Sequence, residues 1–380
     1  MRPLLVSQTN PMALRTVNDA IHVPMAPAIL RDIRVEPGHY PGFLVPMGFN
    51  CVVTAVAGPG SVTFDTPGDL ATVKIMGDAT LRGLDVRNGR GEVALWCAGG
   101  SGLVEHCTFS AARAASSVYA SDDAATGRPG RLALRGCRVH QVGVVYEDAT
   151  GVIEDTEIRD VRHCGLAMER STVEMRRCRI QQTGQDGLRV LAGSRLTLAQ
   201  THISDTTENG LLQGDSETTI SDVRIERAEA GVHYGRGPIM ARNLTVEDAA
   251  TIAVYCDEDA VGTFANTAVR RAGKVGVYAG TERGVTFTGG IVESCGSPEE
   301  PAAGVYTHKG ARLTLEGTTI RANTAGGVVL SPGLGGLTAR SCVITGNRLG
   351  VVNPELPGVV LENNTVHDNP GGDQVESSQA

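Results

Sequence analysis

The sequence predicts an all-β fold, a parallel β-solenoid, on three observations. One six-residue frame recurs through the chain about every 23 residues. Inside each copy, apolar residues two apart alternate with polar ones, which is the pattern of a short strand with one buried face. A second short strand, usually opened by glycine, follows each copy and leaves no room for a helix. Stacked coils of short strands explain all three observations.

The six-residue frame fixes the length of one coil. Its fourth position runs from Leu84 to Asn364, which is 280 residues over 12 steps, and its sixth position is always Val, Ile or Phe. Equivalent residues of successive coils are therefore expected about 4.8 Å apart, and about 13 coils are predicted. The copies span residues 81–86, 104–109, 134–139, 153–158, 175–180, 198–203, 220–225, 241–246, 264–269, 287–292, 315–320, 339–344 and 361–366.

The inward side of the frame carries cysteine, threonine and valine. Nine cysteines are present, an odd number, and four of them occupy the fourth position of the frame. A small buried thiol behaves as an apolar group, so these cysteines are predicted to be reduced core residues and not a disulfide framework. They are Cys107, Cys137, Cys178 and Cys342.

A leucine-rich repeat is the competing solenoid, because Leu81, Leu84, Val86 and Asn88 fit its consensus. The asparagine does not recur, however, and the glycine-opened strand occupies the segment where that fold turns convex. The pattern resembles instead the right-handed parallel β-helix of the pectin-lyase-like superfamily. This resemblance covers about residues 13–368 and implies the fold alone, since the superfamily holds lyases, hydrolases, epimerases and inert scaffolds.

The N-terminal segment is similar to the entry of such proteins, a short capping helix followed by a first strand. Thr16–Ile21 precedes Ile33–Tyr40, and Asn10 and Pro11 are predicted as helix N-cap and first helical residue. The expected organisation is a cap over residues 1–30, a β-helix over 31–367 and a polar, disordered tail over 368–380.

Two coils are overlong, and inserted loops in solenoids often border a binding face. The excursions are expected at Ser121–Gly130 and at Cys295–Pro301.

Composition excludes several function classes. The 380 residues carry a formal net charge of −8, which argues against a nucleic-acid binder with a broad basic surface. No apolar run reaches the length of a membrane span, and the N-terminus turns polar too early for a secretory signal, so a cytoplasmic location is expected. The expected ligand is a small molecule, a sugar or a peptide, and an oligomer is compatible with the sequence.

The outward column of the glycine-opened strands is the candidate site. His233 is predicted as the catalytic base, with Tyr255 and Asp257 as catalytic partners, because an imidazole accepts a proton near neutral pH and a phenol can stabilise an oxyanion. A second group is predicted to bind substrate, the guanidinium groups by holding an anion. That group is Arg189, Arg236, Tyr278, Tyr306 and His308.

These groups suit proton abstraction next to a carboxylate or carbonyl, the first step of β-elimination and of epimerisation. The first hypothesis is therefore a β-helix lyase or epimerase/isomerase, and the alternative is a non-catalytic scaffold or protein-interaction module, since stacked tyrosines also stabilise a sheet without further function. No metal or cofactor is predicted. Asp257–Asp259 could hold a cation, but an acidic solvated turn has the same sequence.

Overall fold

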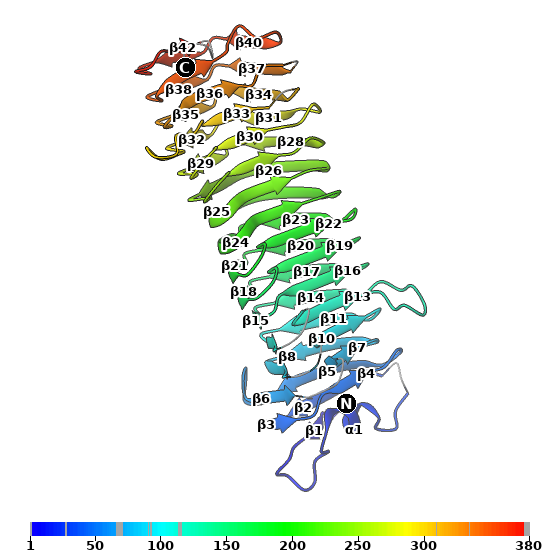
Figure 1. Cartoon of the computed structure of the whole chain (residues 1–380). Coiled ribbons are helices and arrows are strands. Elements are labelled where there is room, and N and C mark those ends of the chain that lie inside the picture. Colours follow the sequence, from blue (N-terminus) through cyan, green and yellow to red (C-terminus); the bar gives the residue numbers. More distant parts are fainter. Residues whose placement is uncertain are drawn as a thin grey trace. The chain divides into compact units, whose positions relative to one another are not determined.

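The computed structural model describes residues 2–26, 29–65, 71–89, 91, 93–112, 116–308, 310–333 and 335–375. The chain forms two compact units, Met1–Gly184 and Gln185–Ala380 (Figure 1). Within the described residues both units are parallel β-solenoid, with about 14 turns against the 13 or so expected. The predicted all-β parallel solenoid is confirmed. The described part of the chain contains no helix with the length and apolar character that crossing a membrane requires.

In unit 1 each complete coil contributes one strand to each of three parallel sheets, called A, B and C in chain order. Sheet A contains β2 (Arg31–Val35), β5 (Asn50–Ala55), β8 (Asp78–Arg82), β11 (Ser101–Glu105), β14 (Arg131–Arg135), β17 (Thr150–Glu154) and β20 (Thr172–Arg176). Sheet B contains β3 (Gly38–Tyr40), β6 (Val62–Asp65), β9 (Leu84–Asn88), β12 (Thr108–Ala111), β15 (Arg138–Gln141), β18 (Glu157–Val161) and β21 (Arg179–Thr183). Sheet C contains β4 (Phe43–Val45), β7 (Ala71–Ile75), β10 (Val93–Ala98), β13 (Val118–Ser121), β16 (Val144–Glu147) and β19 (Leu166–Glu169).

Unit 2 repeats this plan, but three long strands continue from one sheet into the next: β24 (His202–Gln213), β25 (Glu217–Tyr234) and β26 (Gly237–Glu247). Sheet A also has β23 (Arg195–Ala199), β28 (Ala260–Ala265), β31 (Val285–Thr288), β34 (Arg312–Glu316), β37 (Gly336–Arg340) and β40 (Val359–Glu362). Sheet B has β29 (Ala268–Arg270), β32 (Ile291–Glu293), β35 (Thr319–Arg321), β38 (Val343–Thr345) and β41 (Thr365–His367). Sheet C has β22 (Leu188–Leu191), β27 (Val254–Cys256), β30 (Val277–Ala279), β33 (Val305–Thr307), β36 (Gly326–Leu330), β39 (Leu349–Val352) and β42 (Gln374–Val375).

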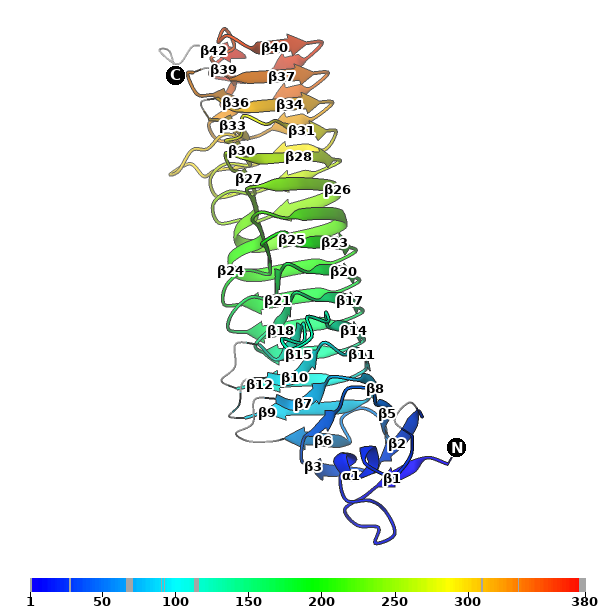
Figure 2. The same cartoon turned by 90° about the vertical axis from the view of Figure 1, so that its right-hand side faces the viewer.

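The N-terminal helix exists, but it begins later than predicted. Helix α1 spans Val17–Ile21 and lies beside β1 (Leu4–Val6) and β2 (Figure 2). Thr16 is its N-cap, because the Thr16 hydroxyl accepts from the Asp19 backbone N–H at 3.1 Å and the Asp19 carboxylate accepts from the Thr16 N–H at 3.0 Å. The prediction of Asn10 as N-cap was wrong, as was that of Pro11 as first helical residue. The Asn10 side chain accepts the Met12 N–H at 3.0 Å within a turn.

Both ends of the predicted solenoid extend further than expected. Strand β1 pairs in parallel with β2, so the segment expected to be only a cap already contributes a strand. Strand β42 pairs with β39, and Val375 is buried. The prediction of a disordered tail from residue 368 is therefore corrected for residues 368–375, while 376–380 lie outside the described residues.

The overlong coils are where the spacing places them. The segment between β13 and β14 folds back on itself through an antiparallel bridge between Asp123 and Arg128. The segment between β32 and β33 is closed by a bond from the Ser297 N–H to the Glu300 carbonyl at 3.0 Å.

The cysteines are core residues, as predicted. All nine are free and buried, and Cys107, Cys137, Cys178 and Cys342 are at most 4% exposed. Burial raises the pKa of the Cys51 thiol to about 12 and that of Cys137 to about 11. These thiols therefore stay protonated and unreactive at neutral pH.

A buried asparagine ladder stabilises the C-terminal coils. The Asn347 side-chain carbonyl accepts from the Asn323 backbone N–H at 3.0 Å and from the Asn323 amide at 2.8 Å. The Asn347 backbone N–H in turn donates to the Asn369 side chain at 3.0 Å. Each asparagine thus pairs backbone groups that the corner between sheets B and C would otherwise leave unsatisfied.

Charged residues occupy the left-handed corners between sheets B and C of unit 2. Asp205, Arg227, Asp248 and Arg271 all have φ between 53° and 59°, in successive coils. The Arg227 guanidinium bonds the Asp205 carboxylate at 2.6 Å, and Arg271 bonds Asp248 at 2.7 Å. These hydrogen bonds lower the pKa of both aspartates below its usual range.

The two ion pairs Arg227–Asp205 and Arg271–Asp248 are called the corner pairs. They predict a pH-dependent contribution to stability. A carboxylate with a lowered folded-state pKa stabilises the fold above its unfolded pKa, and this stabilisation is lost as the pH falls through the folded pKa. We expect the double variant Arg227→Gln/Arg271→Gln to have a lower free energy of unfolding than the wild type at pH 7. The difference in free energy of unfolding between the wild type and the variant should disappear as the pH falls below ~3.9, the ordinary aspartate pKa. Urea unfolding at several pH values measures it. Arg242→Gln, which removes an exposed arginine without an ion pair in the described residues, is the control, and a pH-independent difference would contradict the assignment.

Candidate functional site

The outward column of sheet C in unit 2 has the register that the sequence predicts. Strand pairing places equivalent residues directly opposite one another from β22 to β39. The predicted stacking is therefore confirmed, and the column reads Arg189, Leu212, His233, Tyr255, Tyr278, Tyr306, Val329 and Val352. The four consecutive rings from His233 to Tyr306 are called the aromatic row.

The rings of the aromatic row contact one another. His233 meets Tyr255 edge to face, with ring centroids 4.6 Å apart and planes at 86°. Tyr255 and Tyr278 stack at 4.8 Å, and Tyr278 and Tyr306 stack at 5.6 Å. Because the tyrosine faces cover one another, the row presents ring edges and hydroxyls outward. None of these three phenol oxygens has a hydrogen-bond partner among the described residues.

Burial determines the protonation states in the row. Desolvation lowers the pKa of His233, although the charges of Asp257 and Asp186 oppose it. The imidazole is therefore neutral at pH 7 and can accept a proton. Desolvation and the nearby charges of Asp257 and Glu258 raise the pKa of Tyr255, so its hydroxyl remains a hydrogen-bond donor.

The two predicted arginine anchors are already in ion pairs. The Arg189 guanidinium lies 2.7 Å from the fully buried Asp186 carboxylate and 3.5 Å from Glu208. Leu212 separates Arg189 from His233 in the column. Arg236 pairs with Asp259 at 2.9 Å. Carboxylates of the protein thus already balance both guanidinium charges, and the substrate-binding role of Arg189 and Arg236 stays a prediction.

Asp257 and His308 lie at the margin of the row. The Asp257 carboxylate accepts the Glu258 backbone N–H at 2.8 Å and contributes negative charge near His233. The exposed His308 ring stacks on Tyr278 at 6.1 Å and also lines a small hollow of about 20 Å³. The Asp257 carboxylate beside the row disfavours an anionic ligand at this point and suits an uncharged ligand rich in hydroxyls. No group of three His, Cys, Asp or Glu side chains in the described residues could hold a metal ion.

Sequence reasoning missed an aromatic cluster on sheet C of unit 1. The Lys74 ammonium lies 3.9 Å from the centroid of Trp96, and Trp96 packs against Tyr119 at 6.0 Å. The Trp96 indole donates to Ser121 at 3.0 Å, and the Tyr119 hydroxyl donates to Glu147 at 2.6 Å. The alternation Leu95-Trp-Cys97 and Val118-Tyr-Ala120 marks both strands, but neither follows a glycine. Because its polar ends are paired, the cluster stabilises the sheet.

Comparison with known proteins supports the fold. The family model described as "Right handed beta helix region" matches residues 94–241 and 234–380. The chain belongs to the right-handed β-helix family. No curated protein matches this β-helix protein significantly.

Several solved structures are similar to this β-helix protein at low sequence identity. A glucanase catalytic unit from Streptomyces thermodiastaticus is 14% identical, with a TM-score of 0.49, over 92% of this chain and 65% of its own. A mutant of the periplasmic alginate epimerase AlgG is 10% identical, with a TM-score of 0.43, over 92% of this chain and 81% of its own. A pectin methylesterase in complex with a hexasaccharide is 11% identical, with a TM-score of 0.35, over 65% and 80%.

Proposed function

We propose that the aromatic row is the active site of a β-helix lyase or epimerase that acts on an uncharged, carbonyl-bearing sugar. The observation that carries this proposal is the pairing of His233 with Tyr255. The imidazole has a pKa lowered by burial, and its ring lies 4.6 Å from a phenol whose hydroxyl makes no bond within the described residues. A base and a hydrogen-bond donor are therefore adjacent on an outward surface.

The reaction would proceed by proton abstraction. The His233 imidazole removes the proton from the carbon next to the substrate carbonyl. The C–H electron pair forms the C=C bond of an enolate, and the carbonyl π pair moves to the oxygen. The Tyr255 hydroxyl stabilises the resulting enolate. Protonation of the enolate carbon by water from the opposite face gives the epimer, whereas expulsion of a leaving group from the next carbon gives the elimination product. In both cases the imidazolium returns its proton to solvent. The negative charges of Asp257 and Asp186 favour the transient imidazolium.

The remaining row binds the substrate in this proposal. The Tyr278 and Tyr306 hydroxyls follow Tyr255 at one-strand intervals, about 4.8 Å apart along the sheet. Hydroxyl groups at this spacing can hydrogen-bond successive units of an extended sugar chain. An acidic sugar is disfavoured here, because Arg189 and Arg236 are neutralised and the carboxylates of Asp257 and Glu258 are close.

Solvent deuterium exchange tests the proposal without knowledge of the final product. Incubation of the protein with a panel of keto-sugars and esterified sugar acids in D₂O should introduce deuterium at the carbon next to the carbonyl, as detected by NMR or mass spectrometry. The reaction should require the wild-type row. Exchange at the uncatalysed rate for every member of the panel would refute the enzymatic proposal.

The second candidate function is a non-catalytic contact surface, and one observation favours it. The stacked tyrosines form a continuous ridge, which suits a flat partner protein. Under this alternative the wild type catalyses no exchange, while Tyr278→Ala weakens self-association or partner binding measured by analytical ultracentrifugation.

A further inference from the structure

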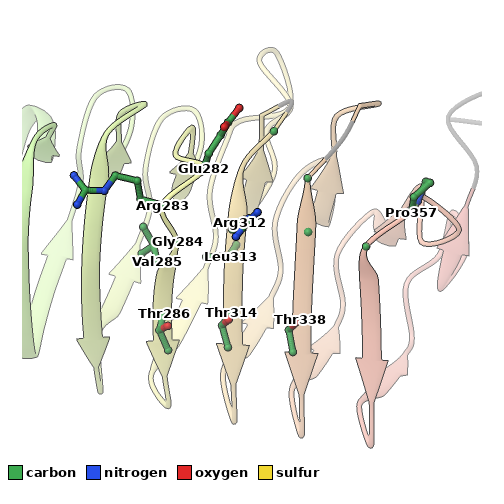
Figure 3. A pocket seen from close by; sticks show the side chains of 14 residues that line it. Glu282, Arg283, Gly284, Val285, Thr286, Arg312, Leu313, Thr314, Thr338 and Pro357 are labelled. Carbon is green, nitrogen blue, oxygen red and sulfur yellow. The ribbon is translucent and has the colours of Figure 1, made fainter.

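A groove of about 850 Å³ lies on sheet A of unit 2, away from the sheet that carries the aromatic row (Figure 3). Its floor is a column of three threonines, Thr286, Thr314 and Thr338, which strand pairing places directly opposite one another on β31, β34 and β37. The loop before β31 supplies Glu282 and Arg283 at one margin, and Pro357 lies at the far end.

Gly284 opens space beside the threonine column. Two positions before the threonines, the outward residues are Gly284, Arg312 and Gly336. A Cβ added to Gly284 would have only the Arg312 Cβ within reach, at 4.0 Å, so the space above Gly284 is open. Gly284 therefore leaves a depression beside the threonine column. At Gly336 a Cβ would lie 3.1 Å from the Gly358 carbonyl oxygen, so the backbone of Gly358 closes that side of the groove.

Within the described residues, the arginine charges and threonine hydroxyls of the groove have no ion-pair or side-chain hydrogen-bond partner. Arg283 and Arg312 are exposed, and neither makes an ion pair within the described residues of the chain. By contrast, most arginines of unit 2 are paired with carboxylates, as in the corner pairs. Among the described residues that line the groove, two arginines therefore face one carboxylate, that of Glu282. The three threonine hydroxyls likewise have no side-chain hydrogen bond among the described residues.

We propose that this groove binds an acidic sugar, a hydroxyl-rich ligand that carries a carboxylate or phosphate group. Arg312 and Arg283 would hold the oxyanion through the planar guanidinium fork, which matches both groups. The threonine column would hydrogen-bond the sugar hydroxyls at one-strand intervals, about 4.8 Å apart. The volume lies within the usual range for a ligand site, ~300–1,000 Å³. This proposal is independent of the aromatic row, which lies on sheet C.

Three matched probes test the groove: glucose, glucuronate and glucose 6-phosphate, which differ only at carbon six. Titration of the intact protein, followed by NMR, should show that at least one charged probe binds about tenfold tighter than glucose, as expected for a charge-assisted bond. The variant Arg312→Gln should remove this preference. The variant Thr314→Val keeps the side-chain shape but removes the hydroxyl, and it should weaken the binding of all three probes by a few fold. A preference for glucuronate alone or phosphate alone supports the proposal and identifies the oxyanion.

Two control variants lie on the same sheet outside the groove, Arg242→Gln and Thr219→Val. Both should bind the charged probes as the wild type does. Equal affinity for all three probes would overturn the proposal, as would a charge preference that survives Arg312→Gln. A loss of binding in Arg242→Gln equal to that in Arg312→Gln would show that the attraction is diffuse and not located in the groove, and would also overturn it.

Discussion

Replacing His233 by alanine is expected to lower turnover by about 100- to 10,000-fold, the usual contribution of a general base. The side chain is half-buried on the outer face of sheet C, so its loss leaves the inward packing of Val232 and Tyr234 intact. Turnover is measured as the initial rate of deuterium exchange or product formation. Thermal unfolding of the variant should remain close to that of the wild type. Undiminished turnover in His233→Ala would refute its role as the base.

The same reaction should depend on Tyr255. Tyr255→Phe is expected to reduce the rate by about 100- to 1,000-fold, as the loss of an oxyanion donor does. Tyr119→Phe is the matched control, because it removes a phenol hydroxyl from sheet C of unit 1. The acid limb of the pH–rate profile should lie below the ordinary histidine pKa of about 6.5, since burial lowers the pKa of His233. An acid limb above that value would contradict the proposed state of the imidazole.

Removal of Asn347 is expected to have the largest effect on stability. Its side chain is fully buried, accepts from the Asn323 backbone N–H and donates to the Ile320 carbonyl at 3.1 Å. Asn347→Leu leaves both groups buried and unsatisfied, at about 1–3 kcal/mol each. We expect the free energy of opening of the C-terminal coils to fall by about 3 kcal/mol. This equals a roughly hundredfold loss of protection of their backbone amides against hydrogen exchange.

Hydrogen exchange measured by mass spectrometry on peptides from the C-terminal coils detects this loss locally, where a repeat fold need not unfold as one unit. Arg242→Ala, an exposed substitution in the same unit, should change protection by less than about 0.5 kcal/mol. Wild-type protection in Asn347→Leu would show that the ladder contributes little.

Periodicity explains why the sequence predicts most of the fold. A repeat that preserves the inward side chain gives the neighbours of His233 and Tyr255 directly, because each coil adds one strand in register. Periodicity contains no information on what lies between the columns. The bond from Arg189 to the buried Asp186 depends on how a corner turns, and the helix start at Thr16 depends on a capping box that competes with the Asn10-Pro11 signal.

Other features could not be predicted from the sequence, because their residue types occur in two common structural contexts. Asn323, Asn347 and Asn369 recur at nearly regular intervals, but asparagine is also frequent in solvated turns. The groove beside Thr314 depends on the absence of a side chain at Gly284, and a glycine in or beside a strand also marks bulges and bends. In each case the role of the residue depends on whether its position is buried or open, and a single sequence does not contain that information.

At the left-handed corners of unit 2, negative and positive side chains alternate from coil to coil. This alternation of charge restricts how the chain can change in length. Asp205, Arg227, Asp248 and Arg271 follow one another coil by coil, and each aspartate is bonded to the arginine of the next coil. Excision of a single coil from this stretch would bring two like charges face to face, whereas excision of two would restore the sequence of signs. Growth or shrinkage of this region by duplication is therefore favoured in steps of two repeats.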